Sequence, residues 1–219
     1  MTPGFVIAVD GPAASGKGTV AGRLAREWRL PYLDTGLLYR AVGVLSQRRG
    51  LDLDDVAAVA RLAEALTADL LGDEAFRTRA AGEAASRVAV HGEVRAALLA
   101  FQRAFATQAG GAVLDGRDIG TVIAPQAPAK LFVTASPEVR ADRRRRQLAA
   151  QGEAVALEEV LADIRKRDAR DAGRDAAPMT RAADAVLLDT SEMTIEQAAD
   201  AARDIVKAAW SAWDLSRRR

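Results

Sequence analysis

The stretch that decides the fold is Phe5-Val-Ile-Ala-Val9-Asp10-Gly11-Pro-Ala-Ala-Ser-Gly16-Lys17-Gly18-Thr19, near the amino terminus. Its apolar start, residues 5–9, predicts a buried strand, and the residues from Lys17 onward predict a helix. Between them the glycines let backbone N–H groups turn inward onto an anion, and the helix amino terminus adds positive potential. Lys17 stands where its side chain can reach the β- and γ-phosphates of a nucleotide. The stretch therefore predicts a phosphate-binding loop made of Gly11, Pro12, Ala13, Ala14, Ser15, Gly16, Lys17, Gly18 and Thr19.

The residue after Lys17 departs from the commonest form of such loops. The usual serine or threonine, whose hydroxyl holds Mg²⁺, is replaced by Gly18, and Thr19 follows. The order G-K-G-T resembles the nucleoside monophosphate kinases more than GTPases or motor ATPases. In such kinases Mg²⁺ is bound largely by nucleotide and water rather than by the protein. Thr19 is the hydroxyl residue nearest Lys17 on its carboxyl side, and we expect it to contact phosphate or Mg²⁺.

The rest of the chain alternates short apolar strands with helices. Strands are predicted at residues 5–9, 31–33, 112–114, 130–135 and 185–188, and helices at 17–28, 36–49, 53–66, 80–90, 93–108, 137–151, 157–169 and 195–213. Asp52 is the expected N-cap of the third helix, and residues 67–79 could hold a small hairpin or an irregular loop. No hairpin signals separate the strands, so the pattern predicts an α/β fold with a parallel sheet covered on both faces.

Composition narrows the class of protein. The 219 residues fit one domain and carry a net charge of only +1, so bulk attraction to nucleic acid is not expected. The absence of cysteine removes disulfides and thiol catalysis, and a single histidine, His91, makes a Ser-His-Asp triad improbable. No apolar run approaches the length of a membrane span, and the amino terminus does not read as a signal peptide. We expect a soluble, cytoplasmic protein, and His91 at the surface.

Two acidic turns follow predicted strands at the same edge of the sheet. Asp34-Thr-Gly-Leu-Leu-Tyr-Arg40 would face the ligand crevice, with Arg40 one helical turn beyond Gly36 and able to clamp a second phosphate. Asp115-Gly-Arg117-Asp118 follows the next strand. Asp115 stands where a carboxylate orders the water molecules around Mg²⁺, and Arg117 could hold an acceptor phosphate. Taken singly, either turn could also be an ordinary capped helix start or a charged turn.

Arginine is concentrated between residues 140 and 174. The chain has only four lysines among 31 basic residues, and this region carries the run Arg143–Arg146 and the pattern R-D-x-R-D-x-x-R from Arg167 to Arg174. Two helices around Gly152 that turn arginines inward would act as a lid over phosphates, which excludes water and neutralises charge. Four consecutive arginines point to all sides of a helix, so some of Arg143–Arg146 must be solvated.

These motifs together resemble the bacterial cytidylate kinase family. The loop G-P-A-A-S-G-K-G-T, then D-T-G-L-L-Y-R, A-S-R-V-A (85–89), V-R-A-A-L (94–98), D-G-R-D-I-G-T-V-I and R-D-A-R-D-A-G-R stand in family order. The resemblance implies the P-loop NMP-kinase fold: a five-stranded parallel sheet, an NMP-binding region at about 36–110 and an arginine-rich lid at about 143–174 within one domain. It implies transfer of the γ-phosphoryl group of ATP to CMP or dCMP, with Mg²⁺.

The resemblance also implies roles for individual residues. The acceptor side would be held by Thr35, Arg40, Arg117 and Arg174, with Ser86, Arg95 and Asp118 around cytosine and Asp171 on the sugar hydroxyls. The lid or phosphate cluster would comprise Arg143, Arg144, Arg167 and Arg170; the catalytic set is Lys17, Arg117, Arg170 and Arg174, and the predicted Mg²⁺ contacts are Thr19 and Asp115, through water. A carboxylate suits cytosine because it accepts from the N4 amino group, whereas uracil presents an oxygen there.

Two segments depart from the family pattern. Family members usually carry a longer insert with its own small β-sheet, and only residues 67–76 occupy that space here. The tail 210–219 has no clear family match; Trp210 and Trp213 are expected to pack within the last helix, and the arginines at 217–219 to be disordered.

Two other functions stay open from the residues alone. One is another small P-loop kinase, for a different nucleotide or a metabolite such as shikimate, which the D-G-R-D and R-D-x-R-D-x-x-R elements disfavour. The other is a nucleotide-dependent regulator or nucleic-acid binder, disfavoured by the near-zero net charge and the lack of a basic surface interleaved with aromatic residues. We expect a monomer that binds small molecules and neither nucleic acid nor membrane.

Overall fold

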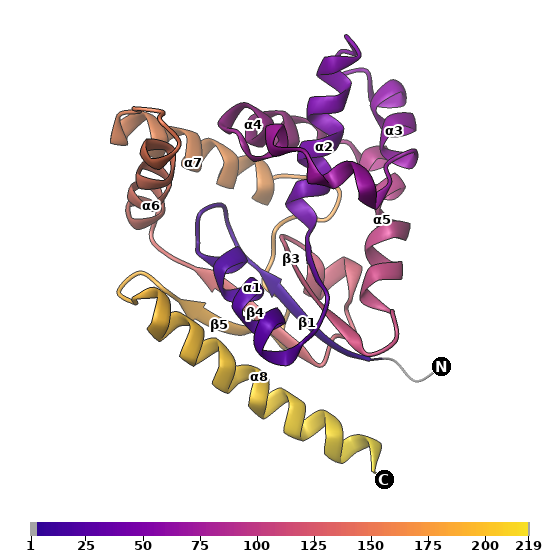
Figure 1. The fold of residues 1–219 in the computed structure, drawn as a ribbon, viewed down its shortest axis with the longest axis vertical. Helices are drawn as coiled ribbons and strands as arrows, with labels where there is room; N and C mark the ends of the chain where they lie inside the picture. The colour runs from indigo at the N-terminus through magenta and orange to yellow at the C-terminus, as the bar shows by residue number, and fades with distance from the viewer. Residues whose placement is uncertain (1–3, 219) are drawn as a thin grey trace.

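A five-stranded parallel sheet forms the centre of the protein in a computed structural model, which describes residues 4–218 (Figure 1). The strands are β1 (Phe5–Asp10), β2 (Tyr32–Asp34), β3 (Gly111–Gly116), β4 (Ala129–Thr134) and β5 (Val186–Asp189), in the order β2-β3-β1-β4-β5. All four pairings are parallel. The predicted α/β class, sheet type and strand positions are confirmed.

Eight α-helices surround the sheet. They are α1 (Lys17–Trp28), α2 (Thr35–Arg48), α3 (Val56–Glu64), α4 (Arg79–Val88), α5 (Gly92–Ala106), α6 (Pro137–Ala150), α7 (Leu157–Ala172) and α8 (Ile195–Arg217). Helices α1 and α8 cover one face, α2 to α5 pack on the other side, and α6 with α7 stands apart beyond the sheet edge (Figure 1). Helix α7 lies beside α4, where Arg79 pairs with Asp163 (Figure 1).

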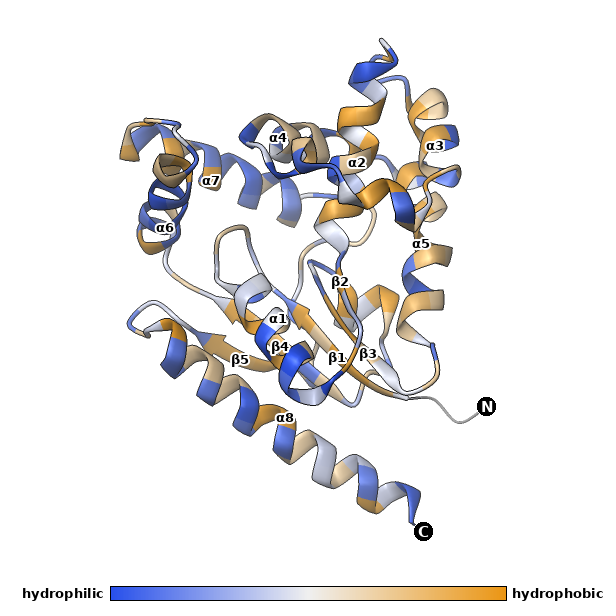
Figure 2. Cartoon of the chain, in the orientation of Figure 1, coloured by the Kyte–Doolittle hydropathy of each residue, from blue (hydrophilic) through white to orange (hydrophobic). Residues whose placement is uncertain are grey.

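The central strand β1 is buried on both faces because its side chains alternate between two apolar clusters. Val6 and Ala8 point into the cluster formed with α2 to α5, whereas Phe5, Ile7 and Val9 point into the cluster formed with α1 and α8. Figure 2 shows the strands as apolar and α6 and α7 as largely hydrophilic, apart from a small cluster of Ala141, Leu148, Val160 and Ile164 between those two helices. The large apolar clusters therefore lie on the two faces of the sheet, and α6 and α7 share only a small one.

The structure differs from the sequence prediction in the start of the third helix and in residues 67–79. The third helix begins after Asp55, whose carboxylate accepts from the amide of Ala58, because Asp52 instead forms a short turn by accepting from Asp54. Asp52 is thus not the N-cap. Residues 67–79 contain two 3₁₀ turns, η1 (Ala68–Gly72) and η2 (Glu74–Arg77), so the hairpin alternative is wrong.

The last helix is longer than the sequence indicated. It continues to Arg217, whose guanidinium lies over the Trp213 ring, and Arg218 pairs with Asp214. The expectation of disorder is therefore wrong for these two arginines, and Arg219 lies outside the described residues. Trp210 and Trp213 do pack, as predicted, against Phe5 of β1.

Helices α2 and α4 approach closely at Gly43. A Cβ atom added there would lie 2.7 Å from the Cβ of Ala84, closer than two carbon atoms can pack. Because α2 carries Arg40 and α4 carries Ser86, this contact sets the distance between two predicted acceptor-site residues.

We predict that Gly43→Ala destabilises the protein by about 1–2 kcal/mol, because forcing α2 and α4 apart outweighs the helix propensity that alanine adds. Urea unfolding measures the loss. Gly72→Ala is the control, since a Cβ there meets no atom within 4 Å. Equal unfolding midpoints for both variants would show that the helices separate freely.

Candidate active site

The carboxyl ends of the strands open into one large cavity. Its volume is about 1130 Å³, and its walls include the phosphate-binding loop, the turns after β2 and β3, α4, α6 and α7. Nineteen of the predicted site residues line it: Ala13, Ala14, Ser15, Gly16, Lys17, Gly18, Thr19, Thr35, Arg40, Ser86, Arg95, Asp115, Arg117, Asp118, Arg143, Arg144, Arg167, Asp171 and Arg174. Gly11, Pro12 and Arg170 are not among its lining residues.

The phosphate-binding loop has the backbone geometry of an anion cradle. Ala14 and Gly16 take left-handed conformations, with φ of 59° and 89°, between β1 and α1. Gly16 caps α1 without a side-chain hydrogen bond, so the first amides of the helix stay available to a ligand. The Ser15 hydroxyl is buried without a partner in the described structure. An anion placed on these amides would satisfy donors that the protein itself leaves open.

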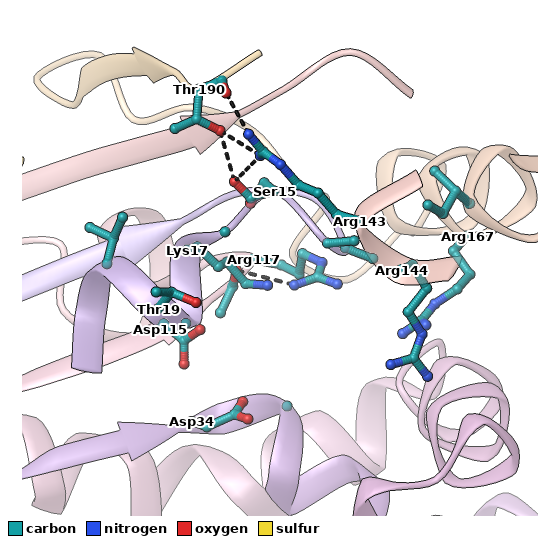
Figure 3. A pocket seen from close by; sticks show the side chains of 18 of the residues that line it. Ser15, Lys17, Thr19, Asp34, Asp115, Arg117, Arg143, Arg144, Arg167 and Thr190 are labelled. Atoms are coloured by element: carbon teal, nitrogen blue, oxygen red, sulfur yellow. Dashed lines mark hydrogen bonds between the residues drawn. The ribbon is translucent and has the colours of Figure 1, made fainter. Parts of the chain in front are cut away.

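Lys17 and Asp115 face each other at the mouth of this loop (Figure 3). Burial, with Arg117 nearby, lowers the pKa of Lys17 to about 8, and Asp115 and Asp34 oppose that shift. Burial, with Asp34 nearby, raises the pKa of Asp115 to about 7. Two neighbouring carboxylates that repel each other indicate a place for a cation.

Asp115 is held in place by Tyr32 and stands over the start of α2. The Tyr32 hydroxyl donates to Asp115 Oδ1 at 3.1 Å, and the Thr35 hydroxyl donates to the Asp115 carbonyl at 2.8 Å. The two carboxylates of Asp34 and Asp115 would suit a Mg²⁺ ion that is held mostly by nucleotide oxygens and water. Within residues 4–218, no group of three or more metal-ligating side chains forms a complete metal site.

Arg117 is oriented by a carboxylate of α7. Its Nε donates to Asp171 Oδ2 at 2.7 Å, and Arg174 Nη1 lies 3.7 Å from the other oxygen of the same carboxylate. Burial raises the pKa of Asp171, but Arg117 and Arg174 outweigh it and hold that pKa below its ordinary value. In the ligand-free arrangement Asp171 therefore organises two arginines.

The predicted base site contains a buried ion pair. Arg95 Nη2 donates to Asp118 Oδ2, and both side chains are less than a tenth exposed. The Arg95 guanidinium also lies over the Tyr39 ring, 5.5 Å from its centre. Asp118 keeps its other oxygen free of protein donors among the described residues, so it can accept from a base.

Ser86 is occupied by a lid arginine. Arg170 Nη1 donates to the Ser86 hydroxyl, and Arg170 Nη2 donates to Glu83 Oε1 at 3.1 Å. The sequence grouped Arg170 with the phosphate-binding arginines, whereas the structure directs its guanidinium to α4. To reach a phosphate it must leave Ser86.

Three other arginines crowd one another on the lid side of the cavity. Burial, together with the nearby Arg117, Arg40 and Arg144, lowers the pKa of Arg167 to about 10, and Asp171 opposes that shift. The Arg167 Nε is buried without a hydrogen-bond partner in the described part of the chain. Arg144 and Arg167 lie side by side in Figure 3. The nearby Asp171 offsets only part of this repulsion, and an anionic ligand would offset the rest.

Arg143 lines the cavity and is held by the loop after β5. It donates to the Thr190 hydroxyl at 2.9 Å and to the Thr190 carbonyl at 2.6 Å, while Thr190 donates to the Ser15 carbonyl (Figure 3). Arg143 thereby joins α6 to the loop after β5 and to the phosphate-binding loop.

Sequence reasoning missed several supporting residues. The Asp10 carboxylate accepts from the amides of Ile119 and Gly120, both at 2.8 Å, and so fixes the turn that carries Asp118. Burial raises the pKa of Asp10 to about 6. An acidic residue that ends an otherwise apolar strand was the available signal. Tyr32 and Thr190 gave no comparable signal.

The sequence matches a known family over nearly its whole length. The family model described as "Cytidylate kinase" matches residues 7–208. The chain belongs to this family. A cytidylate kinase of Caulobacter vibrioides strain NA1000 / CB15N is 69% identical over 204 residues, which cover 93% of this chain and 96% of that protein. A cytidylate kinase of Xanthobacter autotrophicus strain ATCC BAA-1158 / Py2 is 64% identical, covering 93% and 98%.

Solved structures agree on the fold. A gluconokinase from Sinorhizobium meliloti 1021 superposes with a TM-score of 0.50 at 17% identity, covering 98% of each chain. At that identity the likeness shows the fold alone. Three predictions from the sequence are confirmed: the family, the P-loop kinase fold and the enzyme class, an ATP-dependent nucleoside monophosphate kinase. No helix within residues 4–218 is long and apolar enough to cross a membrane.

We predict that Arg167→Met leaves the ligand-free protein as stable as the parent or more so, because it removes a buried cation from a repelling group. It should also lower kcat by roughly 10–1000-fold, because a charge that stabilises the transferring phosphoryl group is lost. Thermal unfolding and steady-state kinetics give the two readings. Arg145→Met, an exposed α6 residue paired with Asp142, is the control and should change neither. Loss of stability with normal kcat in Arg167→Met would contradict the role.

Proposed function

We propose that the protein transfers the γ-phosphoryl group of ATP to CMP or dCMP, giving ADP and CDP or dCDP. The observation that carries the proposal is that one cavity joins the phosphate-binding loop to the buried Arg95–Asp118 pair. A triphosphate on the loop and a nucleoside monophosphate at the pair would bring their phosphates together beneath the lid arginines. The family's name supports cytidine as the nucleoside.

Catalysis follows from positioning and electrostatics. The acceptor phosphate is already ionised, so no strong general base is needed. Lys17 binds the γ-phosphoryl oxygens from the loop side, and Arg117, Arg167 and Arg174 offset the repulsion between the two phosphates. Arg40, on the first turns of α2, holds the acceptor phosphate from the far side.

Mg²⁺ fits beside Asp115, where it would supply charge neutralisation across the β- and γ-phosphates. Asp115 would contact the water shell of the ion, and Tyr32 fixes the orientation of this carboxylate. Thr19 lines the cavity at the start of α1 and is placed for a phosphate or water contact. These assignments rest on the repulsion between Asp34 and Asp115, which a cation would relieve.

Cytosine would be selected because the protein offers an acceptor to its amino group and donors to its ring acceptors. Asp118 accepts from the N4 amino group, while Arg95 and Ser86 donate to the ring acceptors. The Ser86 hydroxyl accepts from Arg170 of α7 and can still donate its own proton to the base, so acceptor binding and the position of α7 are linked. Asp171 orients Arg117 and Arg174, and its contact with the sugar hydroxyls stays a prediction.

Two segments would move around this site. Residues 36–110 would close on the acceptor and residues 143–174 on both phosphates, which excludes water from the transfer. The short 3₁₀ turns at 68–77 leave the acceptor side with less cover than a β-sheet insert would give.

A panel of acceptors tests the function. Coupled assays of ADP formation from ATP with CMP, dCMP, UMP, AMP and GMP should show the highest kcat/KM for CMP or dCMP. Lys17→Ala is the inactive reference, expected to fold normally and to lose phosphoryl transfer. Preference for UMP, AMP or GMP would point to a kinase for another nucleotide, and transfer to none of the five would contradict the proposed function.

We predict that Asp118→Asn weakens selection for cytidine nucleotides, because an amide can donate to uracil O4 as well as accept. The kcat/KM ratio of CMP over UMP should fall by roughly 10–100-fold, the effect of one hydrogen bond to a charged group. Asp73→Asn, on the exposed turn before η2, serves as the control. An unchanged ratio in Asp118→Asn would place that residue outside the base site.

A further inference from the structure

Arg140, on α6, makes four hydrogen bonds although it does not line the cavity. Its Nε donates to the Ala135 carbonyl at 2.9 Å and its Nη1 to the Ala13 carbonyl at 3.2 Å. The same guanidinium binds both carboxylate oxygens of Asp168 on α7, at 3.0 and 2.6 Å. The Arg140 side chain is only 4% exposed. One buried cation thus connects the phosphate-binding loop, the end of β4 and both lid helices.

The partner, Asp168, sits beside the lid residues that face the cavity. Arg167 precedes it, and Asp171 follows one helical turn after Arg167, so these two residues share the cavity face of α7. Asp168 is turned about 100° from Arg167 on the helix and meets α6 instead. The Arg140–Asp168 pair therefore sets the rotation of α7, and with it the direction of Arg167 and Asp171.

The hydrogen bond from Arg140 to the Ala13 carbonyl joins α6 to the phosphate-binding loop. Ala13 directly precedes Ala14, whose left-handed conformation helps form the anion cradle. Arg140 holds the Ala13 carbonyl away from the cradle, so the amides of the loop face the ligand. A change in the position of α7 is thereby transmitted to the loop through a single planar group.

Stability alone does not account for this pair. Leu148, Val160 and Ile164 already pack α6 against α7. A buried ion pair adds little net stability over apolar residues of similar volume, because removing both charges from water is costly. A second ion pair between the same helices, Arg165–Glu138, is about 60% exposed and has no contact with the loop. The buried pair differs in geometry: it fixes orientation at a guanidinium fork.

We propose that Arg140 and Asp168 are positioning residues that hold the lid arginine Arg167 in register with the phosphate-binding loop. This inference rests on the proposed function, because its consequence is measured as phosphoryl transfer. The ligand it serves is the pair of phosphates between which the γ-phosphoryl group moves.

The experiment replaces the pair by apolar residues, Arg140→Met with Asp168→Leu, in the full-length protein. We expect a lower urea midpoint, because the buried Ala13 and Ala135 carbonyls lose their donor, together with a fall in kcat of about 100-fold and a much smaller rise in the Kd of ATP. Arg165→Met is the matched control on the same helix pair and should keep the parental kcat. A folded double variant with parental kcat would overturn the proposal.

A second variant covers the case in which the double variant does not fold. Arg140→Lys keeps the charge but cannot bind two carboxylate oxygens and two carbonyls at once, so kcat should fall at least 10-fold in a folded protein. Parental kcat in Arg140→Lys would likewise overturn the proposal. Absence of CMP phosphorylation by the parent protein would instead refute the proposed function, which separates the two failures.

Discussion

The close approach of β1 to β4 at Gly11 is the constraint on which the site depends. A Cβ atom at Gly11 would lie 1.9 Å from the Val133 carbonyl oxygen, so no other residue permits the chain to leave β1 in this direction. The turn then wraps the end of α1 and brings Lys17 opposite the carboxyl end of β3. Because the sheet is parallel, every polar turn that follows a strand reaches the same edge. One backbone contact thereby brings residues from five strands around a common space.

Charge around that space is distributed unevenly. Some arginines are neutralised by the protein, as Arg95 is by Asp118 and Arg117 by Asp171. Arg167 lies near three further arginines and is left without comparable compensation. The paired arginines are held in fixed directions, and the uncompensated one awaits an anion. The site is thus electrostatically incomplete without substrate, and substrate binding supplies the missing counter-charge to a structure that is otherwise pre-arranged.

The fold could be predicted almost completely from the sequence, because buried strands such as β1 and β3 are short apolar runs that end at glycine or aspartate. The lining of the site could be predicted through motif positions, which is why Lys17, Asp115 and Asp118 all face the cavity. Side-chain pairing could not be predicted in the same way. That Arg143 binds Thr190, and that Arg170 binds Ser86, depends on distances between helices far apart in the chain. Spacing within a motif places a residue on an element, but it does not say which neighbour its guanidinium reaches.

The aromatic cluster has a consequence for spectroscopy. All three tryptophans, Trp28, Trp210 and Trp213, lie together around Phe5 between α1 and α8. Trp28 ends α1, whose other end forms the phosphate-binding loop, so the indoles stand roughly 16 Å from that loop along a helix of 12 residues. Intrinsic fluorescence therefore reports how α1 and α8 pack on the sheet, and the loss of that packing on unfolding. Helices α6 and α7 carry no tryptophan, so any movement of these helices would be followed optically with a fluorophore placed on one of them.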